Sequence, residues 1–128
     1  KAAFIIDEAH VNILSGEVAK LTAQFARRSR KYKTCLIVAT QEPKDFSASE
    51  EVLIHGKAIF NNSAYKLIMN LDLDAMKDVS KLVDLNPNEQ YMIQRFGRGQ
   101  GLFVVGNRRI PINVLASKEE LEAIGGLS

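Results

Sequence analysis

The sequence predicts an α/β fold with a parallel sheet at its core and an antiparallel hairpin near its end. Two short, continuously apolar segments, 2–6 and 35–39, are typical of strands buried on both faces of a parallel sheet. Between them, residues 16–31 place apolar side chains every three or four positions, as one face of a helix does. A strand, a helix and a strand at this spacing form a βαβ unit. Segments 102–105 and 110–115 flank a short polar turn and predict the hairpin.

The other elements follow from capping residues and local periodicity. Ser15 is a suitable N-cap for the first helix, and Ser47 or Ser49 for a short helix over 47–55. Pro111 predicts an edge position for the last strand. We also expect strands at 57–61 and 65–71, helices at 74–83 and 87–96, and a last short helix capped by Ser117 and ending at Gly125–Gly126.

Length and composition indicate one soluble globular domain, residues 1–128. Hydrophobic residues make up 46% and charged residues 25%, which excludes a disordered chain or a disulfide-stapled miniprotein. The net charge of +2 means that any basic surface must be local. The single Cys35 cannot form an internal disulfide, and we expect it to be a buried small apolar residue. No apolar run approaches the ~20 residues of a membrane-spanning helix.

An acidic pair, Asp7 and Glu8, directly follows the first predicted strand. The carboxyl ends of parallel strands are where α/β proteins bind ligands. In a P-loop NTPase, the first carboxylate at this place holds the nucleotide's magnesium, usually through water. A second carboxylate can orient and deprotonate the attacking water. The alternative is an acidic loop that caps the next helix.

The second predicted strand leads into Gln41, about one βαβ unit after Asp7. A polar residue there can contact the γ-phosphate or the attacking water of an NTPase. The alternative is a loop glutamine that contacts only solvent. The combination of Gln41 with the acidic pair is more specific than either feature alone.

Three arginines, Arg27, Arg28 and Arg30, mark the end of the first helix. An arginine from a neighbouring subunit can neutralise the charge that develops on a transferred phosphoryl group. The same side chains can bind the backbone of a nucleic acid. A solvated helix end is the third interpretation.

Three other features carry weaker signals. The segment Gly97–Gly101 leads into a strand and not into a helix, so it is interpreted as a turn. His10 and His55 have no partners at metal-ligand spacing, which predicts no metal site built on them. Arg108 and Arg109 lie at the predicted hairpin tip, facing solvent or a neighbouring subunit.

The sequence lacks the pattern Gly-x-x-x-x-Gly-Lys-Ser/Thr. Such a Walker A loop wraps the β- and γ-phosphates with backbone N–H groups. In a complete NTPase it would precede the 2–6 strand. We therefore expect residues 1–128 to be the C-terminal portion of a longer ATPase domain, with no ATP or Mg²⁺ bound by these residues alone.

Taken in order, several segments resemble the VirB/TraC-type motor ATPases of conjugation and type IV secretion, in the HerA–FtsK branch of P-loop NTPases. The resemblance covers nearly the whole chain. The matching segments are Ala3–Ala9, Phe25–Tyr32, Leu36–Gln41, Ala58–Asn62, Tyr65–Leu67, Gly97–Leu102 and Gly106–Pro111.

This resemblance implies a partial RecA-like fold whose Walker A strand and loop are absent. It implies ATP hydrolysis coupled to conjugative transfer or secretion, with ATP and Mg²⁺ as cofactors of the full-length protein. By resemblance, Asp7 has the Walker B metal role, Glu8 the catalytic base role and Gln41 the sensor role, while one arginine of 27–30 acts in trans. The implied partners are further subunits in a hexamer and other secretion components, with nucleic acid as an additional candidate, at the cytoplasmic face of a bacterial inner membrane.

Two rival interpretations stay open at this point. Asp7–His10 spells the motif of a DEAH-type helicase, and Val38–Thr40 loosely resembles its Ser-Ala-Thr motif. A helicase would place a second RecA-like domain far downstream, whereas this chain is predicted to close with a hairpin and a short helix. The other rival is a non-enzymatic fragment that folds and associates but hydrolyses nothing.

Overall fold

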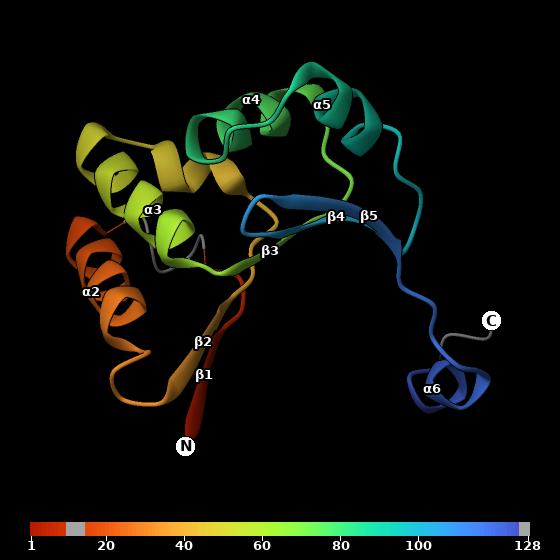
Figure 1. Ribbon diagram of the computed structural model, residues 1–128, viewed down its shortest axis with the longest axis horizontal. Coiled ribbons are helices and arrows are strands. Elements are labelled where there is room, and N and C mark those ends of the chain that lie inside the picture. Colours follow the sequence, from red (N-terminus) through yellow and green to blue (C-terminus); the bar gives the residue numbers. More distant parts are fainter. Residues whose placement is uncertain (10–14, 126–128) are drawn as a thin grey trace.

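The computed structural model describes residues 1–9 and 15–125, and it has an α/β architecture with two sheets (Figure 1). The first sheet pairs β1 (Ala2–Ile6) with β2 (Thr34–Val38), which are joined through α2 (Gly16–Arg28). The second sheet has the order β3 (Tyr65–Ile68), β4 (Gln100–Val105) and β5 (Arg108–Asn113). The other elements are η1 (Pro43–Ser47), α3 (Glu50–Asn62), α4 (Leu73–Leu82), α5 (Pro87–Ile93) and α6 (Lys118–Ala123).

The predicted βαβ unit is confirmed. β1 and β2 are parallel, with a register that runs from Ala2 opposite Thr34 to Ile6 opposite Val38. The first helix begins after Ser15, as predicted, but it ends at Arg28. A turn follows in which Lys33 has a left-handed backbone, with φ of 52°, and this turn delivers the chain into β2.

The predicted strand at 57–61 is wrong, because these residues continue helix α3. The helix begins at its N-cap Ser49, whose hydroxyl accepts a hydrogen bond from the Val52 amide at 3.2 Å. Its buried positions Val52, Gly56 and Ile59 recur at helical spacing and form one face. That face packs on η1 and α4, so tertiary burial selects the helix over the strand.

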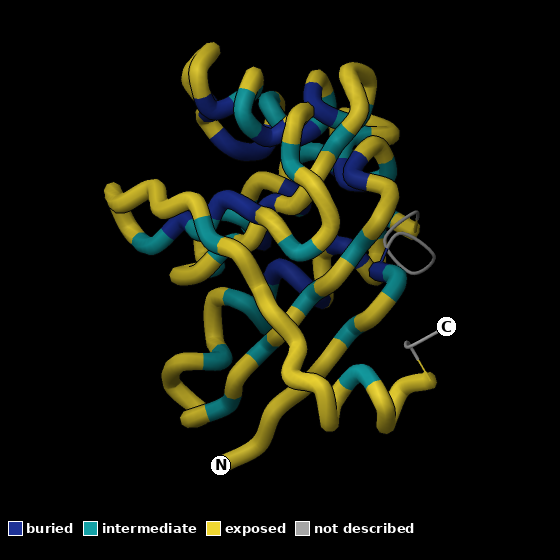
Figure 2. The backbone as a smooth tube through the Cα atoms, turned by 90° about the vertical axis from the view of Figure 1, so that its right-hand side faces the viewer, coloured by how far each residue is buried: buried dark blue, intermediate teal, exposed yellow. Residues whose placement is uncertain are grey.

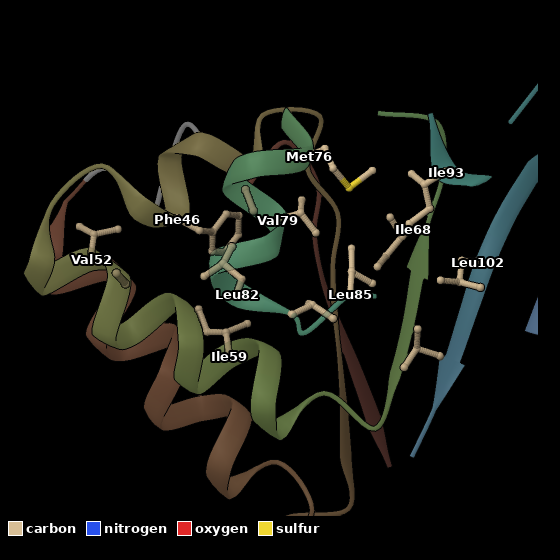
Figure 3. Close-up of a cluster of buried hydrophobic side chains, with 14 of the residues drawn as sticks. Phe46, Val52, Ile59, Ile68, Met76, Val79, Leu82, Leu85, Ile93 and Leu102 are labelled. Carbon is tan, nitrogen blue, oxygen red and sulfur yellow. The ribbon is translucent and has the colours of Figure 1, made fainter. Parts of the chain in front are cut away.

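The core lies between η1, α3, α4, α5 and the inner face of β3 and β4 (Figure 3). Phe46 of η1 is fully buried beside α4, and its ring meets Phe60 of α3 edge to face at 5.6 Å. On the other side of α4, Met76 reaches toward Ile93 and Leu102 next to the second sheet. All three of these side chains are almost completely buried.

The prediction that the first two strands are buried on both faces is wrong. One face of β1 meets α2, where the rings of Phe4 and Phe25 pack edge to face at 5.1 Å. Successive side chains of a strand alternate between faces, so Ile5 and Ile37 point away from α2. Ile5 is 69% exposed and Ile37 is 48% exposed. Cys35 shares their face and is exposed rather than buried. β1 is largely exposed, and β2 alternates between half-buried and exposed residues (Figure 2).

The predicted hairpin is confirmed, with Pro111 on the outer strand β5. Arg109, next to the hairpin turn, contacts other parts of the chain. Its Nη2 donates to the Asp84 carbonyl at 3.1 Å, and its Nη1 lies 3.7 Å from the Glu89 carboxylate. Arg109 therefore ties the hairpin to the start of α5. Burial and this nearby guanidinium lower the pKa of Lys66, which lies in the same row of the sheet.

The C-terminal capping prediction is also confirmed. Ser117 and Glu120 form a reciprocal capping box at the start of α6. The helix follows an extended connection, and Figure 1 shows it apart from the other helices. Among the described residues, no helix is long and apolar enough to cross a membrane.

Candidate functional site

The parallel register brings the acidic pair and Gln41 to the same edge of the first sheet. Ile6 and Val38 are paired, so the loops that follow β1 and β2 leave side by side. The Ala9 amide donates to the Ala39 carbonyl at 2.9 Å and joins these two loops. Across this junction, Gln41 Nε2 donates to Glu8 Oε1 at 2.7 Å. Two residues that are 33 positions apart thus form one polar pair.

Glu8 has an unusual backbone conformation, with φ of 50°. Side chains other than glycine rarely adopt this left-handed region, which costs roughly 1–2 kcal/mol per residue. The Glu8 amide donates to the Asp7 carboxylate at 2.9 Å, and the next residue, Ala9, is fully buried. Local hydrogen bonding and the buried Ala9 therefore hold a strained turn at the edge of the sheet, as is common at functional sites.

The loop that carries Gln41 is anchored on both sides. Before it, the Thr40 hydroxyl accepts a hydrogen bond from the Glu42 amide at 3.1 Å, which forms a tight local turn. After it, Pro43 and Phe46 of η1 are buried. The Lys44 ammonium lies 2.9 Å from the Glu42 carboxylate, and this hydrogen bond raises the pKa of Lys44. The loop that carries Gln41 is therefore held in place on both sides.

The donor set at this edge fits a magnesium ion. Mg²⁺ prefers oxygen ligands, and it commonly uses one or two protein carboxylates together with water and substrate phosphates. The exposed Asp7 carboxylate and the Thr40 hydroxyl supply such oxygens. The described residues contain no group of three or more His, Cys, Asp or Glu side chains that could form a complete protein cage. His10 lies outside the described residues.

The fit to ATP is partial. The edge carries carboxylate, hydroxyl and carboxamide groups. The sequence contains no Gly-x-x-x-x-Gly-Lys-Ser/Thr loop to hold the phosphates.

The three arginines lie at the opposite end of the βαβ unit. Arg27 and Arg28 are in the last turn of α2, and Arg30 follows in the turn before β2. Because β2 starts opposite the start of β1, the five-residue strands separate these arginines from the acidic pair by about 16 Å. The structure therefore does not bring any of them to Glu8 and Gln41 within one chain.

Sequence reasoning missed two features of this edge. Thr40 shapes the Gln41 loop, and the only signal for it is a threonine next to a Gln-Glu-Pro turn. The left-handed backbone of Glu8 has no sequence signal, because glutamate is not a residue that favours positive φ.

The described residues combine a parallel βαβ unit, which carries a polar carboxyl edge, with an antiparallel three-stranded sheet, and together they define an α/β protein. A solved structure that shares the fold is VirB4 of Thermoanaerobacter pseudethanolicus, with a TM-score of 0.83 and 30% sequence identity over 93% of the chain. The similarity confirms the resemblance to VirB4-type ATPases that the sequence indicates. The chain spans 32% of the length of that VirB4 chain. Neither the family models nor the curated proteins compared with the chain match it.

Proposed function

We propose that this chain forms the metal-binding and water-activating part of an ATPase motor that couples ATP hydrolysis to type IV secretion or conjugative transfer. The observation that carries the proposal is the 2.7 Å hydrogen bond between Gln41 and Glu8 at the carboxyl end of paired parallel strands. The similarity to VirB4 supports the same class. It also favours a secretion motor over a DEAH-type helicase.

The proposed roles follow from the chemistry of each side chain. Asp7 holds Mg²⁺ through water, as the carboxylate at the end of a Walker B strand does. Glu8 accepts the proton of the attacking water, and Gln41 orients the Glu8 carboxylate through its amide. Bound Mg²⁺–ATP supplies the phosphoryl group and the charge compensation for its transfer. The phosphate cradle of a RecA-like ATPase must come from residues outside this sequence.

We propose further that one arginine of the 27–30 cluster acts on a nucleotide held by a neighbouring subunit. Its distance from Glu8 within one chain supports action in trans and not in cis. Such a shared site requires an assembly, for which a hexamer is the proposal. The other proposed partners are secretion components, with nucleic acid as an additional candidate, at the cytoplasmic face of a bacterial inner membrane.

The test is Glu8→Gln in the full-length ATPase. We expect a loss of about 10²–10⁴-fold in ATP hydrolysis, because the amide cannot accept the proton from water. Binding of ATP should be nearly unchanged, since Glu8 is proposed to act on water and not on the nucleotide. Phosphate release and nucleotide binding are measured in parallel.

The matched control is Glu17→Gln, which makes the same change on an exposed residue at the start of α2 and should leave turnover unchanged. Near-normal turnover in Glu8→Gln would remove Glu8 from the role of base. Absence of hydrolysis in the unaltered full-length protein would favour the non-enzymatic interpretation instead.

A further inference from the structure

Residues 115–125 form a C-terminal arm that projects from the second sheet and keeps apolar side chains exposed. The Val114 amide donates to the Gly99 carbonyl at 2.7 Å, which fixes the root of the arm. Beyond this root, Leu115 is exposed and Ile124 is 72% exposed. None of the residues of α6 is buried, and Figure 1 shows the helix apart from the rest of the molecule.

The arm has the pattern of an element that packs on another surface. α6 has only six residues, and isolated helices shorter than about 12–15 residues are marginal in water. Leu121 and Ile124 are three positions apart and share one side of the helix, whereas Glu119 and Glu122 lie on the other side. Short helices of this kind gain most of their stability by burying such an apolar side.

An open apolar groove lies between α2 and the first sheet. Its volume is about 160 Å³. Apart from one threonine its lining is apolar, and it consists of Phe4, Ile6, Leu21, Thr22, Phe25 and Leu36. Leu21 is 67% exposed, so part of this apolar surface faces solvent. The groove is on the α2 side of the sheet, opposite to the exposed face that carries Ile5 and Ile37.

The charges beside the groove and on the arm have opposite signs. Arg28 is exposed two turns after Leu21 on the same side of α2, while the acidic Glu17 is in the first turn at the other end. Lys1 and Lys33 directly precede the two strands that line the groove. The arm is acidic, with three glutamates against one lysine: Glu119, Glu120, Glu122 and Lys118. The basic end of the groove therefore attracts the arm electrostatically.

The groove and the arm lie on opposite sides of the molecule. Figure 1 shows α2 at the left and α6 at the right, with the core between them. Because the root of the arm is fixed at Val114, the arm points away from the groove of its own chain. A contact between these two different surfaces joins separate copies head to tail, and such heterologous contacts build rings or open filaments.

We propose that the C-terminal arm of one copy binds the α2 groove of a neighbouring copy. Leu121 and Ile124 pack beside Leu21, and the glutamates of the arm face the cations at the basic end of the groove. Salt weakens this contact, because its ion pairs are exposed. The contact requires no nucleotide, so it goes beyond the proposed ATPase role, and its failure would leave the assignment of the polar edge untouched.

The test is thiol cross-linking between two differently tagged copies of residues 1–128. Both carry Cys35→Ser, which removes the native thiol from the other face of the sheet. One copy carries Leu21→Cys and the other carries Ile124→Cys. We expect a short bismaleimide to give heterodimers at about 0.5 mM protein, because a single short arm should bind with a Kd on the order of 0.1–1 mM. Raising the salt from about 0.05 M to about 0.5 M should lower the yield at least about threefold.

Ile54→Cys is the matched control for Leu21→Cys, because Ile54 is about as exposed but lies on α3. It should cross-link to Ile124→Cys only at background level. In the copy that supplies the arm, Leu121→Asp should lower the heterodimer yield at least about tenfold, since it places a charge in the apolar contact. Ala123→Asp adds the same charge beside this apolar side and should lower the yield less than about twofold.

Three results would overturn the proposal. Equal yields at positions 21 and 54 would indicate random collision, and a cross-link within one chain would place the arm on its own groove. In the full-length ATPase, deletion of residues 117–125 should speed the modification of Leu21→Cys by a maleimide. An unchanged rate there would assign the groove to another occupant. Circular dichroism of each variant reports whether it keeps its fold.

Discussion

At the scale of single residues, the site depends on a side chain held in an unfavourable backbone conformation. Glu8 combines a positive φ with a hydrogen bond to Gln41. If Glu8 had a relaxed, extended backbone, the chain would continue in the direction of β1. The turn at Glu8, fixed by the buried Ala9, is what brings it against the loop after β2.

Because the backbone at position 8 is strained, glycine should be more stable than alanine there, which is the reverse of their order inside a helix. Both Glu8→Gly and Glu8→Ala remove the carboxylate, so their difference isolates the backbone. At φ of 50° we expect Glu8→Gly to be more stable than Glu8→Ala by about 1 kcal/mol in urea unfolding. Lys57 in the interior of α3 is the control position, where alanine should be more stable than glycine by about 1 kcal/mol. If alanine is also the more stable residue at position 8, the turn is not strained.

At the scale of elements, α3 illustrates how context decides a short apolar run. Ala58, Ile59 and Phe60 suit a strand or a helix equally by their own composition. The helix prevails because its residues share one face with Val52 and Gly56 against η1. A β-carbon at Gly56 would lie 2.6 Å from the Phe46 carbonyl, so the close approach of the two elements requires glycine.

Two serines lie at N-cap positions, and their mutation to alanine should lower the stability of the fold by different amounts. Ser49 accepts the Val52 amide, so Ser49→Ala should lower the free energy of unfolding by about 1 kcal/mol. Ser15 occupies the same position before α2, but its side chain makes no capping hydrogen bond. Ser15→Ala should therefore change stability by less than about 0.5 kcal/mol. Thermal or urea unfolding of both variants measures the difference, and equal losses would contradict the assigned cap geometry.

At the scale of the whole molecule, the candidate site lies at the margin of the core, next to the buried Ala9. Buried side chains gather around η1, α3, α4 and the second sheet, while the first sheet keeps one face exposed (Figure 2). The candidate active site stands at the end of this less covered sheet. Its loops are held by the buried residues Ala9, Pro43 and Phe46, while the strands that lead into it are partly exposed.

The exposed apolar face of the first sheet predicts self-association of residues 1–128. Burying an isoleucine side chain contributes about 1.5–3 kcal/mol, and an exposed strand edge recruits further strands. Ile37→Lys should therefore weaken association at least about tenfold. Sedimentation velocity over a concentration series measures this, with a reducing agent present because Cys35 is exposed.

Ile54→Lys is the control for that experiment, because Ile54 is 64% exposed on α3, away from the sheet. It should leave the association constant nearly unchanged. A monomer at every concentration, or equal weakening by both variants, would show that the open sheet face is not the contact.

The sequence by itself determined the features that depend on local pattern. The apolar segments around Phe4 and Ile37, the helical spacing between them, and the caps Ser49 and Ser117 are readable because periodicity and capping act over a few residues. The same pattern predicted that Asp7, Glu8 and Gln41 follow strands that end at one edge. Their assignment to ATP chemistry stays a prediction.

Only the tertiary structure decided the features that depend on contacts between distant segments. The Gln41–Glu8 hydrogen bond joins residues 33 positions apart, and no local rule specifies it. The helix at 57–61 arises from the packing of α3 on η1 and α4. Burial acts on a whole face at once, so it can override the preference of a five-residue run.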